Sequence, residues 1–301
     1  MVYLRRLPRF EYLSPGTIDE TCQLLAAHGK QAALLAGGTD LLVQMRRRET
    51  SPLFVIGIKN VTALTGLQVQ GDGGLSIGAM TTIQALATSP MVRTKYSVLS
   101  EIAALIGGPE LHNVATLGGN VAGALPCADF PPALMTLEAK LKLRSTQGER
   151  TVAIEDFYAE FGRTVAGPHE LLSEIILPAP LSGSAGAYLK FHDRHSMDMT
   201  TVGVAAFVVP DQSRSNFRNV RIALASSAPV TIRARKAEAA LRGQPYSEDA
   251  LVQAAAIACA ESEPRSSWRA TREFRLELVH SLTMRAIRRA WQKASAAGAP
   301  A

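Results

Sequence analysis

The chain has 301 residues, of which 47% are hydrophobic and 19% charged, a balance that is typical of globular proteins and excludes an intrinsically disordered one. Its net charge is +6, but the basic residues are scattered, and no aromatic residues interleave with the one dense run at 46–48, so nucleic-acid binding is not expected. The longest apolar run, at 202–209, is far shorter than the ~20 residues that cross a bilayer. Because the first residues also lack the apolar core of a signal peptide, we expect a cytoplasmic protein with no integral membrane segment.

The first third of the chain predicts a small α/β subdomain over residues 1–57. Thr17 and Glu20 form a capping box that begins a helix over 17–27, and Gly29 ends it. The segments that follow are a strand at 32–36, a Gly-Gly-Thr turn at 37–39, a helix at 40–48 and a buried strand at 53–58.

A second α/β subdomain is expected over residues 58–177. Glycine-rich turns at 71–74 and around Gly148 predict two hairpins. Helices are expected at 83–87, 96–106 and 130–137, and strands at 140–144 and 170–177. Pro178, Pro180 and the small residues at 181–186 favour a linker, so we place a domain boundary after residue 177.

Residues 178–301 are expected to form a separate C-terminal domain. The predicted strands are 187–191, 200–209 and 220–225, and the predicted helices are 231–241, 247–260 and 274–294. Strands gathered before helices favour a three-stranded antiparallel sheet with a layer of helices on one face. The whole chain is therefore expected to be an α+β protein.

Two Gly-Gly turns are the main candidates for a ligand site. The first comprises Leu35, Ala36, Gly37, Gly38, Thr39 and Asp40, and the second Ala115, Thr116, Leu117, Gly118, Gly119 and Asn120. Glycine has no Cβ, so backbone N–H groups can approach a bound group closely. Two such nests of N–H donors facing each other would suit the two phosphates of a pyrophosphate. Asp129 adds a carboxylate that can accept from hydroxyl groups, or cap the helix expected to follow it.

Cysteine and histidine usage indicates no metal site. Cys22, Cys127 and Cys259 lie far apart with no Cys-x-x-Cys pair, so an iron–sulfur or zinc site held by this chain is not expected. Their odd number argues against a disulfide framework. His192 and His195 share a loop, but the spacing His-x-x-His is common in loops and carries little weight as a metal signal.

The glycine turns resemble those of the FAD-binding medium subunit of molybdenum hydroxylases, a family of carbon monoxide dehydrogenase and xanthine dehydrogenase type. The resemblance is carried by residues 36–40, 77–82 and 113–120 and by Asp129 with 131–134, and further matches run to the C-terminus. It implies a p-cresol methylhydroxylase/vanillyl-alcohol oxidase-like FAD domain over 1–177. It also implies one bound FAD, whose pyrophosphate and ribityl region both turns would grip.

The resemblance assigns roles to single residues as well. Asp129 matches an aspartate near the cofactor, where it would accept from ribose or ribityl hydroxyls. Lys190 matches a lysine beside the flavin, where a cation would stabilise the reduced ring; a strand lysine reaching solvent is the alternative. Leu172 and Ile106 match flavin-contacting positions, although an aromatic residue stands in place of Ile106 in the xanthine enzymes. The loop at 192–198 would lie near the flavin edge.

The resemblance implies an electron-transfer subunit with no catalytic residue of its own. The partners would be a large molybdopterin-binding subunit and a small subunit with two 2Fe–2S clusters, in a dimer of heterotrimers. Electrons would pass from the clusters through FAD to NAD, quinone or oxygen. Residues 120–129 lack the cysteine-rich insertion that holds a further cluster in relatives resembling 4-hydroxybenzoyl-CoA reductase. The alternatives are a self-contained FAD oxidoreductase of the vanillyl-alcohol oxidase-like group and a nucleotide-binding module without redox function.

Overall fold

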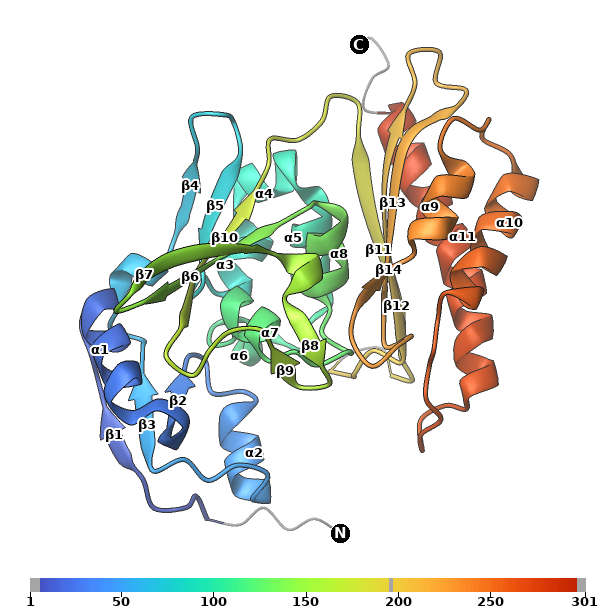
Figure 1. Ribbon diagram of the computed structural model, residues 1–301. Helices are drawn as coiled ribbons and strands as arrows, with labels where there is room; N and C mark the ends of the chain where they lie inside the picture. Colours follow the sequence, from blue (N-terminus) through green and yellow to red (C-terminus); the bar gives the residue numbers. More distant parts are fainter. Residues whose placement is uncertain (1–5, 195–196, 297–301) are drawn as a thin grey trace.

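The structure is a computed structural model that describes residues 6–194 and 197–296 (Figure 1). The N-terminal subdomain is a parallel three-stranded sheet of order β1-β3-β2. Its elements are β1 (Glu11–Leu13), α1 (Ile18–His28), η1 (Gly29–Gln31), β2 (Ala32–Leu35), α2 (Leu41–Arg47) and β3 (Phe54–Gly57). The predicted cap of α1 is confirmed, because the Thr17 hydroxyl accepts from the Glu20 N–H at 3.1 Å.

The second subdomain is built on an antiparallel sheet of order β4-β5-β10-β6-β7. Its strands are β4 (Leu67–Val69), β5 (Leu75–Gly78), β6 (Lys140–Ser145), β7 (Gly148–Ala153) and β10 (Leu171–Leu177), with a small β8 (Tyr158–Glu160) and β9 (Arg163–Thr164) hairpin beside it. Its helices are η2 (Thr62–Leu64), α3 (Ile83–Thr88), α4 (Pro90–Lys95), α5 (Ser97–Leu105), α6 (Pro109–His112), α7 (Leu117–Ala122), α8 (Phe130–Thr136) and η3 (Ile154–Asp156). Both predicted hairpins are present.

The C-terminal part has four antiparallel strands, one more than predicted. They are β11 (Ala185–Phe191), β12 (Val202–Pro210), β13 (Phe217–Ala225) and β14 (Ile232–Arg233), followed by α9 (Arg235–Leu241), α10 (Glu248–Ala260) and α11 (Arg272–Ala296). The helix predicted from residue 231 was wrong at its start, because Ile232 and Arg233 pair with β13. Helix α9 begins only after that pairing ends.

Both faces of this C-terminal sheet are buried. Along β12, Val204 and Ala206 pack in the core shared with α10 and α11, whereas Ala205 and Phe207 pack in the core of the first domain. Figure 1 shows the sheet standing between α5 and α8 on one side and α10 and α11 on the other. The sheet is therefore the layer that joins the two halves of the molecule. Within residues 6–194 and 197–296, no helix combines the length and apolar character needed to span a membrane.

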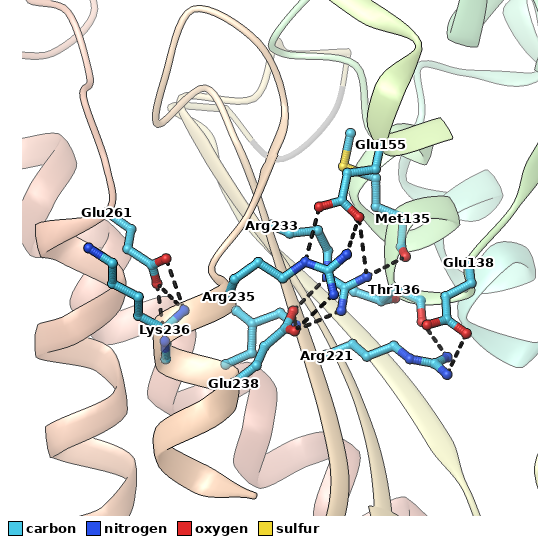
Figure 2. A network of polar contacts seen from close by, with 12 residues as sticks. Met135, Thr136, Glu138, Glu155, Arg221, Arg233, Arg235, Lys236, Glu238 and Glu261 are labelled. Carbon is cyan, nitrogen blue, oxygen red and sulfur yellow. Dashed lines mark hydrogen bonds and ion pairs between the residues drawn. The ribbon is translucent and has the colours of Figure 1, made fainter. Parts of the chain in front are cut away.

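The short helix α8, whose seven residues are all buried, is bonded to the C-terminal sheet at both ends. At its carboxyl end, Arg221 donates to the Thr136 carbonyl at 3.0 Å and Arg233 to the Met135 carbonyl at 3.3 Å (Figure 2). Cations at this end of a helix are stabilised by its dipole. At its other end, the Asp129 carboxylate accepts from three side chains of the C-terminal part.

Arg233 is held in turn by a buried ion pair. Its guanidinium lies 2.5 and 2.8 Å from the two carboxylate oxygens of Glu238, and the two side chains are 3% and 1% exposed. Glu238 also accepts from the Ile222 N–H at 2.9 Å, which leaves little of its hydrogen-bonding capacity unused. Removing one partner of such a pair destabilises the folded state strongly, because the other partner remains buried and charged without a counter-ion.

We expect Arg233→Met to lower the free energy of unfolding by about 3–5 kcal/mol, because the buried Glu238 would lose the cation that contacts both of its oxygens and keep only a 3.9 Å ion pair with the exposed Arg235. Urea unfolding followed by circular dichroism measures the loss. The matched control is Arg288→Met, which breaks an exposed pair with Glu248 and should leave the unfolding midpoint where it is. Equal losses in the two variants would contradict the assigned role of Arg233.

Candidate functional site

The two glycine turns, far apart in the sequence, lie against each other backbone to backbone. An ideal Cβ built on Gly37 would lie 2.0 Å from the Val114 carbonyl oxygen, and one on Gly119 would lie 4.0 Å from the Ala36 Cβ. Only glycine at position 37 permits this approach. Gly38 has a φ of 74°, a left-handed conformation that also favours glycine.

The first turn presents a row of backbone donors. The N–H groups of Gly37, Gly38, Thr39 and Asp40 have no acceptor within residues 6–194 and 197–296. The Asp40 carboxylate makes no capping bond at the start of α2, so it does not take them up. Successive free amides in a turn form a concave site for an anion. The first turn therefore has the free amides that an anion-binding nest requires.

The nest predicted at the second turn was wrong. The N–H of Leu117 donates to the Thr81 carbonyl at 3.0 Å, that of Gly118 to Ala79 at 2.8 Å, and that of Asn120 to Thr116 at 3.0 Å. The Gly119 N–H donates to the Thr116 hydroxyl, which caps α7, at 3.0 Å.

The turn instead packs on the 77–82 segment. An ideal Cβ on Gly118 would lie 2.6 Å from the Ala79 Cβ and carbonyl oxygen, so Gly118 serves close packing and not ligand binding through its amide. What this turn offers a ligand is the Asn120 side chain. Its oxygen accepts from the Phe130 N–H at 3.4 Å, and its amide nitrogen has no acceptor in the described part of the chain.

Exposure follows the same division between the turns. The first turn is open or half-buried along its length, whereas the second is buried until Gly119 and Asn120. The buried residues of the second turn are Ala115, Thr116, Leu117 and Gly118, and the half-buried ones of the first are Leu35, Ala36, Gly37, Gly38 and Thr39. Asp40 is exposed, but the surrounding chain removes part of the water from its carboxyl. This desolvation raises the pKa of Asp40, and a hydrogen bond from Thr39 opposes the rise.

Asp129 precedes α8 but does not cap it, so the capping alternative was wrong. One carboxylate oxygen accepts from the Tyr188 hydroxyl at 2.7 Å and from the Thr200 hydroxyl at 2.6 Å. The other accepts from the Lys190 ammonium at 3.2 Å. Burial, together with the Asp129 charge, holds the pKa of Tyr188 well above its ordinary value, so its hydroxyl stays a donor.

Lys190 is buried, with only 4% of its side chain exposed, so the solvent-facing alternative was wrong. Lys190 lines a pocket of about 80 Å³ between the end of α5 and the loop after β11. The other lining residues are Ala104, Leu105, Gly107, His192, Met197 and Asp198. Ile106 and Leu172 are 9% and 7% exposed and belong to the core of the first domain. A ligand could therefore contact only the small exposed part of each side chain.

The loop at 192–198 is organised by Asp198, while His195 lies outside the described residues. The Asp198 carboxylate accepts from the N–H groups of Asp193 at 2.8 Å and Met199 at 2.9 Å. Burial would raise the pKa of Asp198, but these donors and that of Arg194 bring it down to about 2. Arg269 joins the loop from the segment before α11 with an ion pair of 3.4 Å to Asp198.

No metal or thiolate chemistry is indicated near these groups. Among the residues that the structure describes, no set of three or more His, Cys, Asp or Glu side chains is placed to hold a metal ion. Cys127 is the cysteine nearest to Asp129 in sequence. Burial raises the pKa of its thiol, and the Asp129 charge adds to this rise, so the thiol stays protonated.

Sequence reasoning missed three residues that belong to this site. Tyr188 lies two positions before Lys190, and strand alternation places both on one face of β11, which is a signal that could have found it. Thr200 and Arg269 gave no comparable signal, since each reaches the site from a loop.

Comparison with known proteins agrees with this arrangement. Residues 8–180 match the family model of the FAD binding domain in molybdopterin dehydrogenase, and residues 187–290 match that of the CO dehydrogenase flavoprotein C-terminal domain. The chain therefore belongs to the FAD-binding flavoproteins of the molybdopterin dehydrogenases, as the glycine turns suggested. It is a component of an oxidoreductase, and its cofactor is FAD.

Individual relatives match over nearly the whole chain. The carbon monoxide dehydrogenase medium chain of Hydrogenophaga pseudoflava is 34% identical, covering 95% of this chain and 98% of its own. The xanthine dehydrogenase FAD-binding subunit of Escherichia coli is 33% identical, covering 92% and 94%. Among solved structures, carbon monoxide dehydrogenase of H. pseudoflava superimposes with a TM-score of 0.93 at 34% identity, over 96% of this chain and 99% of that one. Quinoline 2-oxidoreductase of Pseudomonas putida gives 0.90 at 30% identity, over 96% and 99%.

We expect Gly37→Ala to lose most of the bound FAD, because its Cβ would push the Val114 carbonyl away and separate the two turns. The ratio of flavin absorbance to protein absorbance after gel filtration measures retention. Gly71→Ala is the matched control, since a Cβ there meets nothing within 4 Å, and it should retain FAD fully. FAD retention in Gly37→Ala equal to that in Gly71→Ala would remove this turn from the binding site.

Proposed function

We propose that this chain is the FAD-carrying electron-transfer subunit of a molybdopterin-dependent hydroxylase. It would receive electrons from 2Fe–2S clusters of a partner subunit and pass them to an external acceptor. The main support for this proposal is the row of backbone amides at 37–40, which have no acceptor in the described part of the chain and lie against the second glycine turn. It occurs in a chain that matches the FAD-binding family over both of its halves.

The residues of the site fit FAD. Its diphosphate needs N–H donors, which the free amides of 37–40 supply, and its ribityl chain needs polar groups such as the Asn120 amide. The rest of the two glycine turns surrounds these donors and forms with them what we call the phosphate cradle. These residues are Leu35, Ala36, Ala115, Thr116, Leu117, Gly118 and Gly119. Ile106 and Leu172 offer apolar edges, and Lys190 supplies a buried positive charge. FAD brings the redox chemistry when bound, so the chain has only to hold it, orient it and tune it.

We further propose that the partners are a large molybdopterin-binding subunit and a small 2Fe–2S subunit, in a dimer of heterotrimers in the cytoplasm. A surface beside the Lys190 pocket suits the docking of the cluster subunit. Trp268 is 84% exposed and Met197 63% exposed, and Met197 also lines the pocket. Arg269 stacks on Trp268 at 4.2 Å and pairs with Asp198 of the pocket. Exposed Trp, Met and Arg side chains are enriched at protein interfaces.

The domain boundary proposed after residue 177 is supported by the chain path. Strand β10 ends at Leu177, Pro178 and Pro180 follow, and β11 opens a different sheet at Ala185. The family models end and begin on either side of this segment, at residues 180 and 187. The subdomain division after Gly57 follows the end of β3, the central strand of the parallel sheet.

The purified chain is expected to bind one FAD and to show flavin absorbance bands. It is expected not to hydroxylate purines or other N-heterocycles and not to oxidise carbon monoxide. Absorbance spectra and substrate-oxidation assays with an artificial electron acceptor test both parts. Turnover by the chain alone would favour the self-contained FAD oxidoreductase. Absence of FAD from both the isolated and the FAD-supplemented chain would contradict the proposed function.

Trp268→Ala is expected to weaken association with the cluster subunit about thirty-fold, corresponding to the ~2 kcal/mol of an interface hot spot. Calorimetric titration of the co-expressed partner measures the affinity, and an unchanged flavin spectrum shows that the site is intact. Val252→Ala is the control, because Val252 is an exposed apolar residue on α10, outside this surface. Equal affinities for the two variants would rule out docking at Trp268.

A further inference from the structure

We infer that Asp129 acts on FAD through Lys190, as the residue that positions its ammonium, and not as a direct acceptor for FAD hydroxyls. The inference rests on the proposed function, since it assigns Asp129 a task toward the FAD of that site. The four residues that carry it, named here the Asp129 network, are Asp129, Tyr188, Lys190 and Thr200.

The Asp129 carboxylate is already largely occupied. A carboxylate offers about four lone-pair positions. Three of these accept from Tyr188, Thr200 and Lys190, at 2.7, 2.6 and 3.2 Å respectively. Asp129 as a whole is 8% exposed. One position on the oxygen facing Lys190 is left, which is too little for a residue whose main task is to hold a polyhydroxyl chain.

The Lys190 ammonium, by contrast, has donors to spare. An ammonium has three N–H bonds, and Asp129 is its one hydrogen-bond partner within the described part of the chain. The remaining two donors belong to a residue that lines the pocket between α5 and the loop after β11. Asp198 also lines this pocket, but its oxygens accept from backbone N–H groups and arginines. The Lys190 ammonium therefore has free donors for an electron-rich ligand at this pocket.

The position of Asp129 is fixed by the fold and not by Lys190 alone. Tyr188 and Lys190 project from the same face of β11, and Thr200 stands just before β12. Helix α8 begins immediately after Asp129 and is held at its far end by Arg221 and Arg233. A lysine on a strand normally turns its end to solvent. Here a carboxylate anchored on another element keeps it inside.

Without Asp129, the ammonium would be buried and unpaired, a state that proteins avoid by neutralising or withdrawing the charge. FAD would then lose the nearby cation that favours its reduced form. The effect of removing Asp129 on the reduction potential should therefore depend on whether Lys190 is present. A direct contact between Asp129 and FAD hydroxyls would show no such dependence.

The test is a double-mutant cycle on the full-length chain with Asp129→Asn, Lys190→Met and both together. The midpoint potential of bound FAD and the FAD dissociation constant are measured for each. We expect each single variant to lower the potential and to weaken FAD binding about ten-fold, the scale of a lost hydrogen bond to a charged group. In the Lys190→Met background, Asp129→Asn should lower the potential no further and weaken binding no further.

Tyr188→Phe separates this effect from simple destabilisation. It removes one donor to Asp129 and leaves both charges of the ion pair in place. We expect a lower thermal unfolding midpoint and a smaller change in potential than in Asp129→Asn. Equal, additive effects of Asp129→Asn in both Lys190 backgrounds, or a raised potential in Asp129→Asn, would overturn the inference. Failure of the unaltered chain to bind FAD would instead overturn the proposed function.

Discussion

The buried helix α8 is the constraint on which the arrangement of the site depends. Its first residue donates through its N–H to Asn120 of the second glycine turn, and the residue before it is the hub of the Asp129 network. Its last carbonyls accept from arginines of the C-terminal sheet. A helix bonded at both ends cannot rotate or slide without breaking charged hydrogen bonds. Helix α8 thereby links Asn120 of the second glycine turn to Lys190, which lies in the other domain.

The two glycine turns look alike in sequence but have different roles in the structure. The first keeps its amides free because α2 starts beyond it and the neighbouring backbone supplies no carbonyl for them. In the second turn the backbone N–H groups donate to Thr116 and to the 77–82 segment, so its glycines allow close packing of the chain. A glycine doublet therefore predicts close backbone approach, and whether the partner is a ligand or the chain itself depends on the surroundings.

The glycine turns, the hairpins and the order of strands and helices could be predicted from the sequence because they rest on local patterns. The boundary near residue 231 could not, because Ile232 and Arg233 become a strand only by pairing with β13. The burial of Lys190 could not be predicted either, since Asp129, its partner, lies 61 residues earlier in the chain. The same holds for α8, whose capping arginines, Arg221 and Arg233, come from β13 and β14. Contacts between distant elements are what local sequence reasoning does not contain.

The placement of Lys190 on β11 bears on how the protein matures. Synthesis proceeds from the N-terminus, so both glycine turns leave the ribosome before β11 exists, and α11, which packs on the sheet that carries β11, emerges later still. A nascent chain that has made only its first domain has the phosphate cradle but not the buried cation. FAD bound by this first domain alone would lack the Lys190 cation, so full binding affinity is reached only after β11 has been synthesised and has folded onto the first domain.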